Sequence, residues 1–246
     1  MNHLTGLFWG VKNPEFLQGL QQAINHTAPD GIHAADNIFT IGRNLGFLED
    51  ARFVDAWQKN AQTEVERAIV WRLHVLSWAA RSVLARAVPG DFVECACYKG
   101  TSARLICDDV GWASTGRRFY LYDLFEHDAS MTHHAMPEHG AGLYARVKAR
   151  FADLPSVVVT QGSVPAVLRD VAPERIAFMH IDMNNAESEI GALEVLFERL
   201  SPGGILILDD YGWRAYRQQK LAEDPWLAAR GYTVLEMPTG QGMVIK

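Results

Sequence analysis

The last stretch of the chain, GYTVLEMPTGQGMVIK at residues 231–246, decides the fold. Residues 232–236 and 243–246 both read as β-strands, and only a short Pro- and Gly-containing segment separates them. A parallel connection needs a dozen or more residues, so no crossover helix fits in this gap. The two strands are therefore predicted to form an antiparallel hairpin at the end of a sheet.

Upstream of this hairpin, from Gly90 onward, strand and helix patterns alternate in five βα units. Unbroken apolar runs such as IAFMHI at 176–181 are typical of parallel strands that helices cover on both faces. The helices are expected near residues 102–109, 142–151, 165–170, 187–200 and 213–222. The predicted fold class is a doubly wound, mostly parallel seven-stranded α/β sheet. NAD-type domains do not require such an antiparallel ending. With it, the predicted sheet resembles that of class I S-adenosylmethionine (SAM) methyltransferases.

The first third of the chain is expected to form a helical layer. Residues 14–20 can form a short amphipathic helix, and residues 63–87 place apolar side chains every three or four positions, as one long helix does. We therefore expect a helical substrate or oligomerisation layer at 1–88 and a SAM-binding core at 89–246, integrated as one domain. Residues 35–50 mix aromatic, Asn and Arg residues that could line a substrate pocket or a subunit contact.

Composition excludes several classes of protein. The 23 basic and 29 acidic residues give a net charge of −6, and no Lys/Arg run offers a surface for nucleic acid. Three cysteines without zinc-binding spacing indicate a reduced compartment. Neither a signal-peptide pattern nor an apolar run of membrane-spanning length occurs. We expect a cytoplasmic protein whose partner is a small molecule, not nucleic acid or membrane.

Ligands of an open parallel sheet bind beyond the carboxyl ends of its strands, so the residues that follow each strand are the candidates. The first strand is followed by the small-residue turn 94–102, whose backbone can approach a ligand. Gly100 is the only glycine of this turn, so the G-x-G-x-x-G pattern of NAD-binding domains is absent and NAD is disfavoured as the ligand. Asp123 ends the second strand, where a carboxylate can accept hydrogen bonds from ribose hydroxyls or simply cap a helix. Gly162 and Ser163 follow the third strand and can meet a base edge, although turn chemistry explains them equally well.

Asp182, Asp209 and Asp210 end the fourth and fifth strands and are expected to meet at one rim of the sheet. Three neighbouring carboxylates repel unless a cation compensates them, and an all-oxygen set suits Mg²⁺ or a similar hard divalent ion. Asn184 could add a neutral oxygen. The alternative is that one or two of these acids only cap helices.

Histidines provide a further set of candidates. His133, His134 and His139 lie in a long polar segment after Asp123, which is typical of an active-site lid; they could be bases, metal ligands or solvated surface. His180 lies two residues before Asp182, on the same face of the strand. It is expected to be either a buried, hydrogen-bonded histidine or a catalytic base.

The segments GDFVECACYKGTSA (90–103), YLYDLFE (120–126) and HIDMNNAESEIGALEVLFERLSPGGILILDDYG (180–212) together resemble the macrocin-type sugar O-methyltransferases of macrolide and related antibiotic pathways. The resemblance covers residues 91–216. It implies a SAM-binding role for the following residues: Glu94, Ala96, Tyr98, Gly100, Thr101, Ser102 and Asp123. We also expect Gly162, Ser163 and Asp182 to contact the cofactor. The resemblance also implies that Asp182, Asp209 and Asp210 bind Mg²⁺ and that Asp182 is the candidate catalytic base.

The chain departs from the family pattern at two of these positions. Ala96 stands where the family has Gly, and Asn184 stands where it has a second Asp. The resemblance nevertheless implies a SAM-dependent, Mg-assisted O-methyltransferase of natural-product biosynthesis, acting on a small-molecule hydroxyl of a sugar or another diol. It also favours a homodimer.

Two other functions stay open at this point. One is a metal-independent SAM methyltransferase that uses His139 or His180 as its base. The other is a non-catalytic SAM- or nucleotide-binding module in which the three acids are structural.

Overall fold

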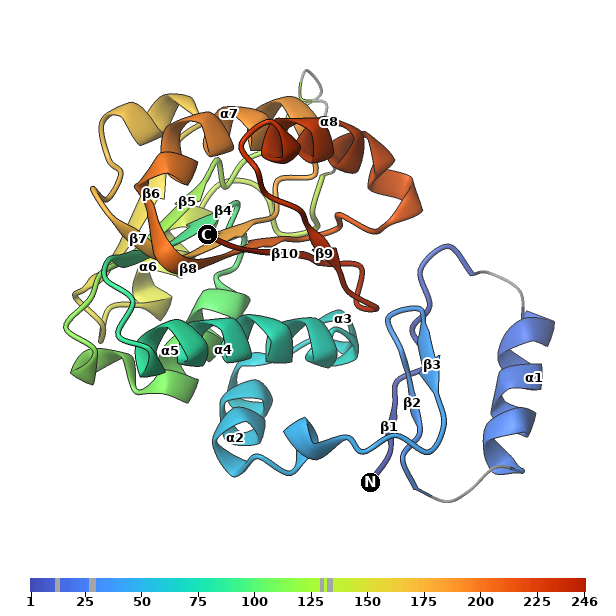
Figure 1. Ribbon diagram of the computed structural model, residues 1–246. Helices are drawn as coiled ribbons and strands as arrows, with labels where there is room; N and C mark the ends of the chain where they lie inside the picture. The colour runs from blue at the N-terminus through green and yellow to red at the C-terminus, as the bar shows by residue number, and fades with distance from the viewer. Residues whose placement is uncertain (12–13, 27–29, 129–130, 132–134) are drawn as a thin grey trace. The chain divides into compact units, whose positions relative to one another are not determined.

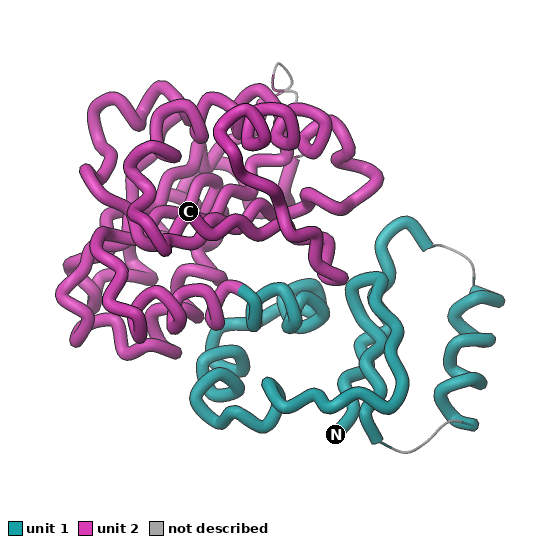
Figure 2. Tube along the Cα trace, in the orientation of Figure 1, with its two compact units in different colours: residues 1–75 teal, residues 76–246 magenta. Residues whose placement is uncertain are grey.

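The computed structural model describes residues 1–11, 14–26, 30–128, 131 and 135–246. The chain forms two compact units, Met1–Val75 and Leu76–Lys246 (Figure 2). The boundary falls inside helix α4, Val70–Ala85, and not at residue 88 as the sequence suggested. Across the described ranges, none of the helices has the length and apolar character that crossing a membrane requires.

The larger unit is built on a seven-stranded sheet in the order β6-β5-β4-β7-β8-β10-β9 (Figure 1). Its strands are β4 Asp91–Cys95, β5 Phe119–Asp123, β6 Val157–Gln161, β7 Ile176–Ile181, β8 Leu200–Leu208, β9 Leu235–Glu236 and β10 Gly242–Ile245. Its helices are α5 Thr101–Val110, α6 Leu143–Arg150, α7 Ala186–Leu196 and α8 Arg217–Ala228. The first five strands are parallel, whereas β10 pairs antiparallel with both β8 and β9. The predicted fold class, including the C-terminal hairpin, is therefore confirmed.

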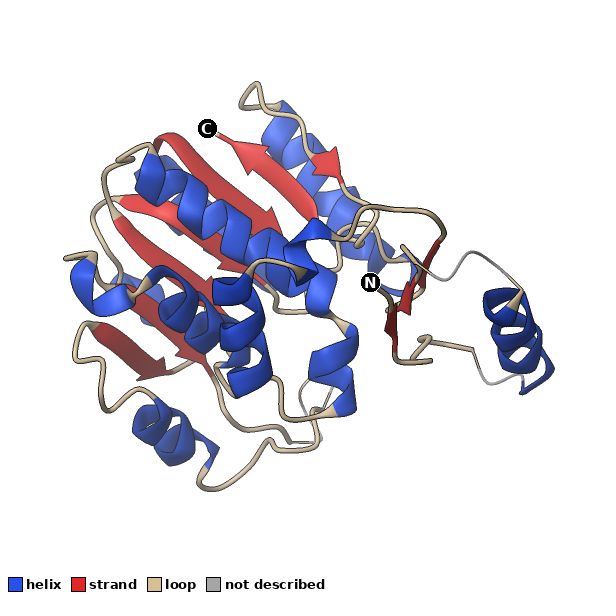
Figure 3. Ribbon diagram, turned by 90° about the horizontal axis from the view of Figure 1, so that it is seen from below, coloured by secondary structure: helices blue, strands red, loops and turns tan. Residues whose placement is uncertain are grey.

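Helices cover both faces of this sheet, with α7 and α8 on one face and α5 on the other (Figures 1 and 3). Every residue of β7 is buried, as the unbroken apolar run predicted. The core on the α7 and α8 side consists of aliphatic and aromatic side chains from β7, β8 and α7, among them Met179, Leu206 and Leu193. The sheet is thus a rigid support for the loops at its carboxyl edge.

Three of the predicted helices differ most from the observed ones. The helix expected at 165–170 is a short 3₁₀ turn, Ala166–Arg169. Helix α8 begins later than predicted, after a 3₁₀ turn at Arg214–Tyr216, and continues past Pro225. The single helix expected at 63–87 is two helices, α3 Glu64–Ala68 and α4, because Ile69 leaves helical geometry at ψ 20°.

The smaller unit is not purely helical, which corrects the predicted helical layer. It contains a three-stranded sheet of β1 His3–Leu4, β2 His33–Ala35 and β3 Ile38–Thr40, together with α1 Pro14–Asn25, α2 Ala51–Asn60 and α3. Asp36 and Asn37 join β2 to β3 with positive φ at both residues, as a type I′ hairpin turn requires. Strands this short carry too little alternation to be recognised in the sequence.

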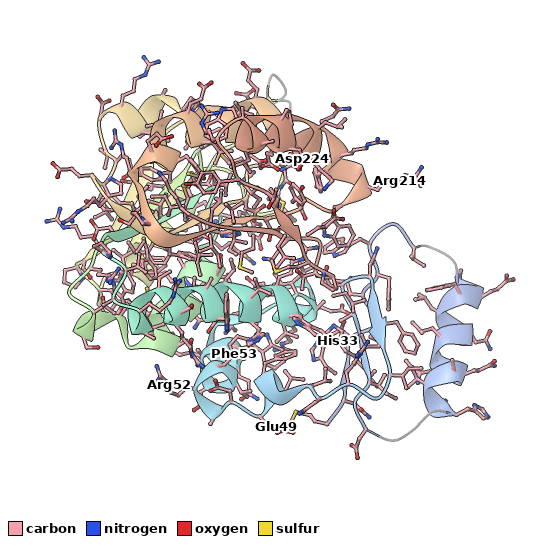
Figure 4. The ribbon with its side chains drawn as sticks, in the orientation of Figure 1. His33, Glu49, Arg52, Phe53, Arg214 and Asp224 are labelled. Atoms are coloured by element: carbon pink, nitrogen blue, oxygen red, sulfur yellow. The ribbon has the colours of Figure 1, made fainter. Side chains whose placement is uncertain are left out.

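The interior of this smaller unit contains several aromatic and imidazole side chains. His33 and Phe53 are fully buried and labelled in Figure 4. His33 stacks on His3 with ring centroids 5.2 Å apart and meets Trp71 edge-on. Burial lowers the pKa of His33 to about 4, so its imidazole is neutral at physiological pH. The neutral rings therefore pack as part of an aromatic core.

Candidate functional site

A cavity of about 370 Å³ lies at the carboxyl edge of the sheet, in the larger unit. Its walls come from the segments that follow β4, β5, β6 and β7. The sequence predicted six of its lining residues as cofactor contacts: Ala96, Tyr98, Asp123, Gly162, Ser163 and Asp182. A cavity of this size is within the range of small-molecule sites, and its place at the strand ends is where such sheets bind ligands.

The β4–α5 turn brings backbone to the cavity wall through unusual dihedral angles. Ala96 and Tyr98 adopt positive φ values of 66° and 48°. The N–H groups of Ala96 and Cys97 both donate to the Tyr122 carbonyl, at 2.8 and 3.1 Å, which fixes the turn on β5. The turn is thus held by its neighbours in a conformation that L-residues disfavour.

Ala96→Gly is expected to stabilise the protein. A left-handed conformation costs a non-glycine residue about 1–2 kcal/mol, while glycine adds about 0.5–1 kcal/mol of unfolded-state entropy. The net gain of up to about 1 kcal/mol should raise Tm by about 2–4 °C in thermal unfolding. Ala149→Gly, at an exposed site in α6, is the control and should lower Tm; a lower Tm for both variants would contradict the strain at Ala96.

Gly100 has a packing role in this turn. It precedes α5 with φ 70°, and a Cβ on it would lie 2.7 Å from Cε2 of Phe151. Thr101 Oγ1 accepts from the Arg150 guanidinium at 3.3 Å. Neither residue is among those that line the cavity, so the structure places both of these predicted cofactor contacts outside its wall.

Asp123 ends β5 and connects two loops of the cavity wall. Its Oδ2 accepts from the Tyr98 backbone N–H at 2.7 Å, and its Oδ1 accepts from the Phe125 N–H at 2.6 Å. Only 7% of the residue is exposed. Each carboxylate oxygen has a second lone pair, so the group can hold both loops and still accept from a ligand hydroxyl.

Glu94 lies behind the turn, 1% exposed, and not on the cavity wall. Its Oε1 accepts from Ser102 Oγ at 2.6 Å and is 2.8 Å from His180 Nδ1. Oε2 is buried and has no donor within the described ranges. Glu94 and Ser102, both predicted cofactor contacts, therefore hold each other and His180 beneath the turn.

His180 is a buried histidine that lies between two carboxylates. Burial alone would lower its pKa, but the carboxylates of Asp209 and Glu94 outweigh burial and raise the pKa to about 10. Its Nε2 lies 3.7 Å from Asp209 Oδ1. His180 is 3% exposed, contacts Glu94 and is not among the cavity-lining residues, so its buried, hydrogen-bonded interpretation is favoured over a base.

Asp182, Asp209 and Asp210 converge as the sequence predicted. Each offers one oxygen, and the three oxygens lie within 4.8 Å of one another. Opposite ligands are about 4–5 Å apart around a six-coordinate Mg²⁺ or Ca²⁺, twice the metal–oxygen distance. Even as a cation, His180 could not balance the charge of these three carboxylates and Glu94, so the charge and the oxygen chemistry both fit a hard divalent cation.

The orientation of Asp209 depends on the C-terminal hairpin. Gln241, fully buried in the turn just before β10, donates from Nε2 to Asp209 Oδ1 at 2.9 Å. Thr239 Oγ1 donates in turn to Gln241 Oε1 at 3.1 Å, which orients the amide. The sequence analysis did not identify Gln241, because a lone glutamine in a turn carries no recognisable pattern.

The long segment after β5 contributes His139 to the cavity, whereas His133 and His134 lie outside the described residues. The Met136 N–H donates to His139 Nδ1 at 3.2 Å. Burial, the largest effect, lowers the pKa of His139, so the ring is neutral and its proton lies on Nε2. His139 is therefore arranged to donate a hydrogen bond at Nε2 and not to accept a proton there.

Other lining residues were not predicted as contacts. They are Asn185 and a set of apolar or small side chains: Leu124, Met131, Met136, Val164, Met183 and Ser188. Leu124 and Val164 directly follow predicted contacts, so proximity along the chain was the available signal. Met131 and Met136 reach the cavity only through the path of the long segment, which no sequence pattern specifies.

Comparisons with known proteins identify the family and the fold of this chain. A family model described as Macrocin-O-methyltransferase (TylF) matches residues 49–231. A tetracenomycin rhamnosyl 4'-O-methyltransferase of Streptomyces olivaceus is 32% identical in an alignment of 172 residues that covers 59% of this chain. The match spans 62% of that relative's length.

Solved structures share the fold. The O-methyltransferase NovP superposes with a TM-score of 0.62 at 20% identity, covering 76% of this chain and 83% of NovP. CalS11, a calicheamicin methyltransferase, gives 0.60 at 16% identity, covering 96% and 94% of the two chains. The fold is that of class I methyltransferases, and with the family match over most of its length the chain belongs to the macrocin O-methyltransferase family.

Proposed function

We propose that this chain is a SAM-dependent O-methyltransferase, assisted by a divalent cation such as Mg²⁺, that acts on a hydroxyl of a natural-product sugar or another vicinal diol. One observation carries the proposal: Asp182 belongs both to the cavity wall and to the three-carboxylate cluster. A methyl donor in the cavity and a cation among the carboxylates would therefore share one residue. The names of two similar proteins, a rhamnosyl 4'-O-methyltransferase and a TDP-rhamnose 3'-O-methyltransferase, support the substrate class.

The cavity residues fit SAM by their chemistry. Asp123 is an acceptor for ribose hydroxyls, and Leu124 and Val164 offer apolar surface to adenine beside Gly162 and Ser163. SAM supplies an activated methyl group, and these residues bind and orient it.

The carboxylate cluster fits a cation that assists the acceptor. A bound Mg²⁺ would supply Lewis acidity, which lowers the pKa of a hydroxyl near it. Asp182 faces the cavity and is the group that we assign to accept the hydroxyl proton. Asp209 and Asp210 are 8% and 9% exposed, so their carboxylates would bind the cation from the buried side of the site.

Removal of the cation tests this function against its rivals. We expect EDTA to abolish methyl transfer to a panel of glycosides and phenols, read by mass spectrometry, and Mg²⁺ to restore it. S-Adenosylhomocysteine binding, measured by calorimetry, should persist in EDTA because the SAM contacts are separate from Asp209 and Asp210. Turnover that is insensitive to EDTA would select a metal-independent methyltransferase, and SAM binding without turnover on any acceptor would select a binding module.

A further inference from the structure

A buried carboxyl pair lies between α7 and α8, outside the cavity. Glu189 on α7 is 1% exposed, and Gln219 and Glu223 on α8 are 2% and 0% exposed. The two helices pack side by side (Figure 1). Glu189 Oε1 accepts from Gln219 Nε2 at 2.6 Å and from the Met183 backbone N–H at 3.1 Å. A buried acid on one helix thus contacts the backbone of the loop that follows β7.

The remaining oxygens of the pair lack donors. Among the described residues, no N–H or O–H donates to Glu189 Oε2 or to either oxygen of Glu223. Burial and the neighbouring carboxylate of Glu223 both raise the pKa of Glu189 well above its usual range. Two ionised carboxylates cannot hydrogen-bond to each other, because each only accepts. A proton on Glu189 Oε2 resolves this, since Oε1 then serves as the carbonyl oxygen that takes both N–H donors.

We propose that Glu189 is a positioning residue of the acceptor side of the cavity, and that it acts as a neutral acid which shares its proton with Glu223. This inference rests on the proposed function. Met183 lies between Asp182 and Asn184, and all three line the cavity. Asn184 has a φ of 54°, so the loop needs an anchor to keep this conformation. Glu189 provides the anchor at the Met183 N–H and thereby sets the direction of Asp182.

The charged groups around the pair do not supply the missing donor. Lys220 on α8 is engaged with Tyr211, Asp224 and Glu236. Asp224, labelled in Figure 4, adds negative charge on the same helix. The thiol of Cys95 on β4 is buried, and burial raises its pKa, so it stays neutral. The surroundings therefore favour retention of the proton.

The pair should make stability depend on pH in a defined direction. Burial raises the pKa of Glu223 to about 7 and that of Glu189 well above its usual range. Above about pH 4.5 the unfolded chain releases protons that the folded pair retains, so stability falls as pH rises toward the folded values. Loss of the shared proton would separate the two groups and release the Met183 anchor.

Glu189→Gln tests the inference because an amide reproduces the neutral acid. Its oxygen can accept from Met183 and Gln219, and its NH₂ can donate to Glu223. We expect its kcat/KM for the acceptor at pH 7 to lie within about threefold of wild type, without the wild-type decline at alkaline pH. Glu189→Met, which removes the acceptor, should raise KM for the acceptor about tenfold, on the scale of a lost hydrogen bond, with unchanged S-adenosylhomocysteine affinity. The control is Glu194→Gln, an exposed position on the same helix.

Two readouts do not require methyl transfer, so they separate this inference from the proposed function. Tm of wild type should fall more steeply with pH than Tm of Glu189→Gln, whereas Glu194→Gln should follow wild type. Infrared spectra of wild type at pH 7 should contain a carboxylic-acid carbonyl band that Glu189→Gln lacks. Equal pH slopes for wild type and Glu189→Gln would overturn the shared proton. A divalent cation that raises Tm of wild type at pH 8, but not of Glu223→Gln, would also overturn it, in favour of a bound cation.

Discussion

Asp209→Asn is expected to lower kcat for methyl transfer about 100- to 1000-fold, the usual loss when one preorganised electrostatic group is removed from a site. Asparagine keeps the size of the side chain and an oxygen for Gln241 Nε2, but it loses the negative charge. The affinity for a divalent cation should fall with that charge. Asp209 is not among the cavity-lining residues, so the dissociation constant of S-adenosylhomocysteine should change less than about threefold.

Mass spectrometry of the methylated product and calorimetry of S-adenosylhomocysteine measure the two effects separately. Asp170→Asn is the matched control, because it makes the same substitution at an exposed position away from the carboxylate cluster. Thermal unfolding verifies that both variants fold. If Asp209→Asn had the wild-type turnover rate at limiting Mg²⁺, the proposed catalytic role of the cation would be wrong.

Asp123→Ala is expected to have the opposite profile, raising the S-adenosylhomocysteine dissociation constant about 10- to 100-fold. One or two hydrogen bonds to a charged acceptor account for a change of this size. The substitution also leaves the backbone N–H groups of Tyr98 and Phe125 without their acceptor. The two loops that they belong to form part of the cavity wall, so preorganisation is lost together with the direct contact.

Calorimetry should show this loss at saturating and at limiting Mg²⁺ alike, because Asp123 is not part of the carboxylate cluster. Glu126→Gln, three residues further along the same loop and exposed, is the control and should bind normally. Asp123→Asn should be intermediate, since its single carbonyl oxygen can satisfy one of the two N–H groups. If Asp123→Ala and Asp209→Asn had equal effects on cofactor affinity, the separation between a cofactor site and a cation site would be wrong.

The sheet could be predicted from the sequence because its signals are local. The short gap between 232–236 and 243–246 allows only a hairpin, and the long apolar runs of β7 and β8 allow only buried strands. The small sheet around His33 could not be predicted, because three-residue strands are fixed by their partners and by packing. The break at Ile69 could not be predicted either, because the apolar residues keep their helical spacing across it.

The sequence could predict those residues of the candidate site that lie at or directly after the end of a strand. Asp182, Asp209 and Asp210 meet because neighbouring parallel strands end at one edge. Glu94 was harder, because its pairing with His180 depends on the register of β4 on β7. The methionines of the long segment and Gln241 depend on the path of loops, and the Glu189–Glu223 pair depends on how two helices pack.

The hydrogen bond from Gln241 to Asp209 has a consequence for engineering. Chimeras that exchange C-terminal hairpins between relatives are a natural route to new acceptor preferences, since the rest of the sheet would stay intact. In this chain such an exchange would also replace the amide that orients an acid of the cation cluster. A grafted hairpin would therefore need a glutamine at this position. Without it, the chimera would keep the fold but lose the orientation of Asp209 on which the proposed reaction depends.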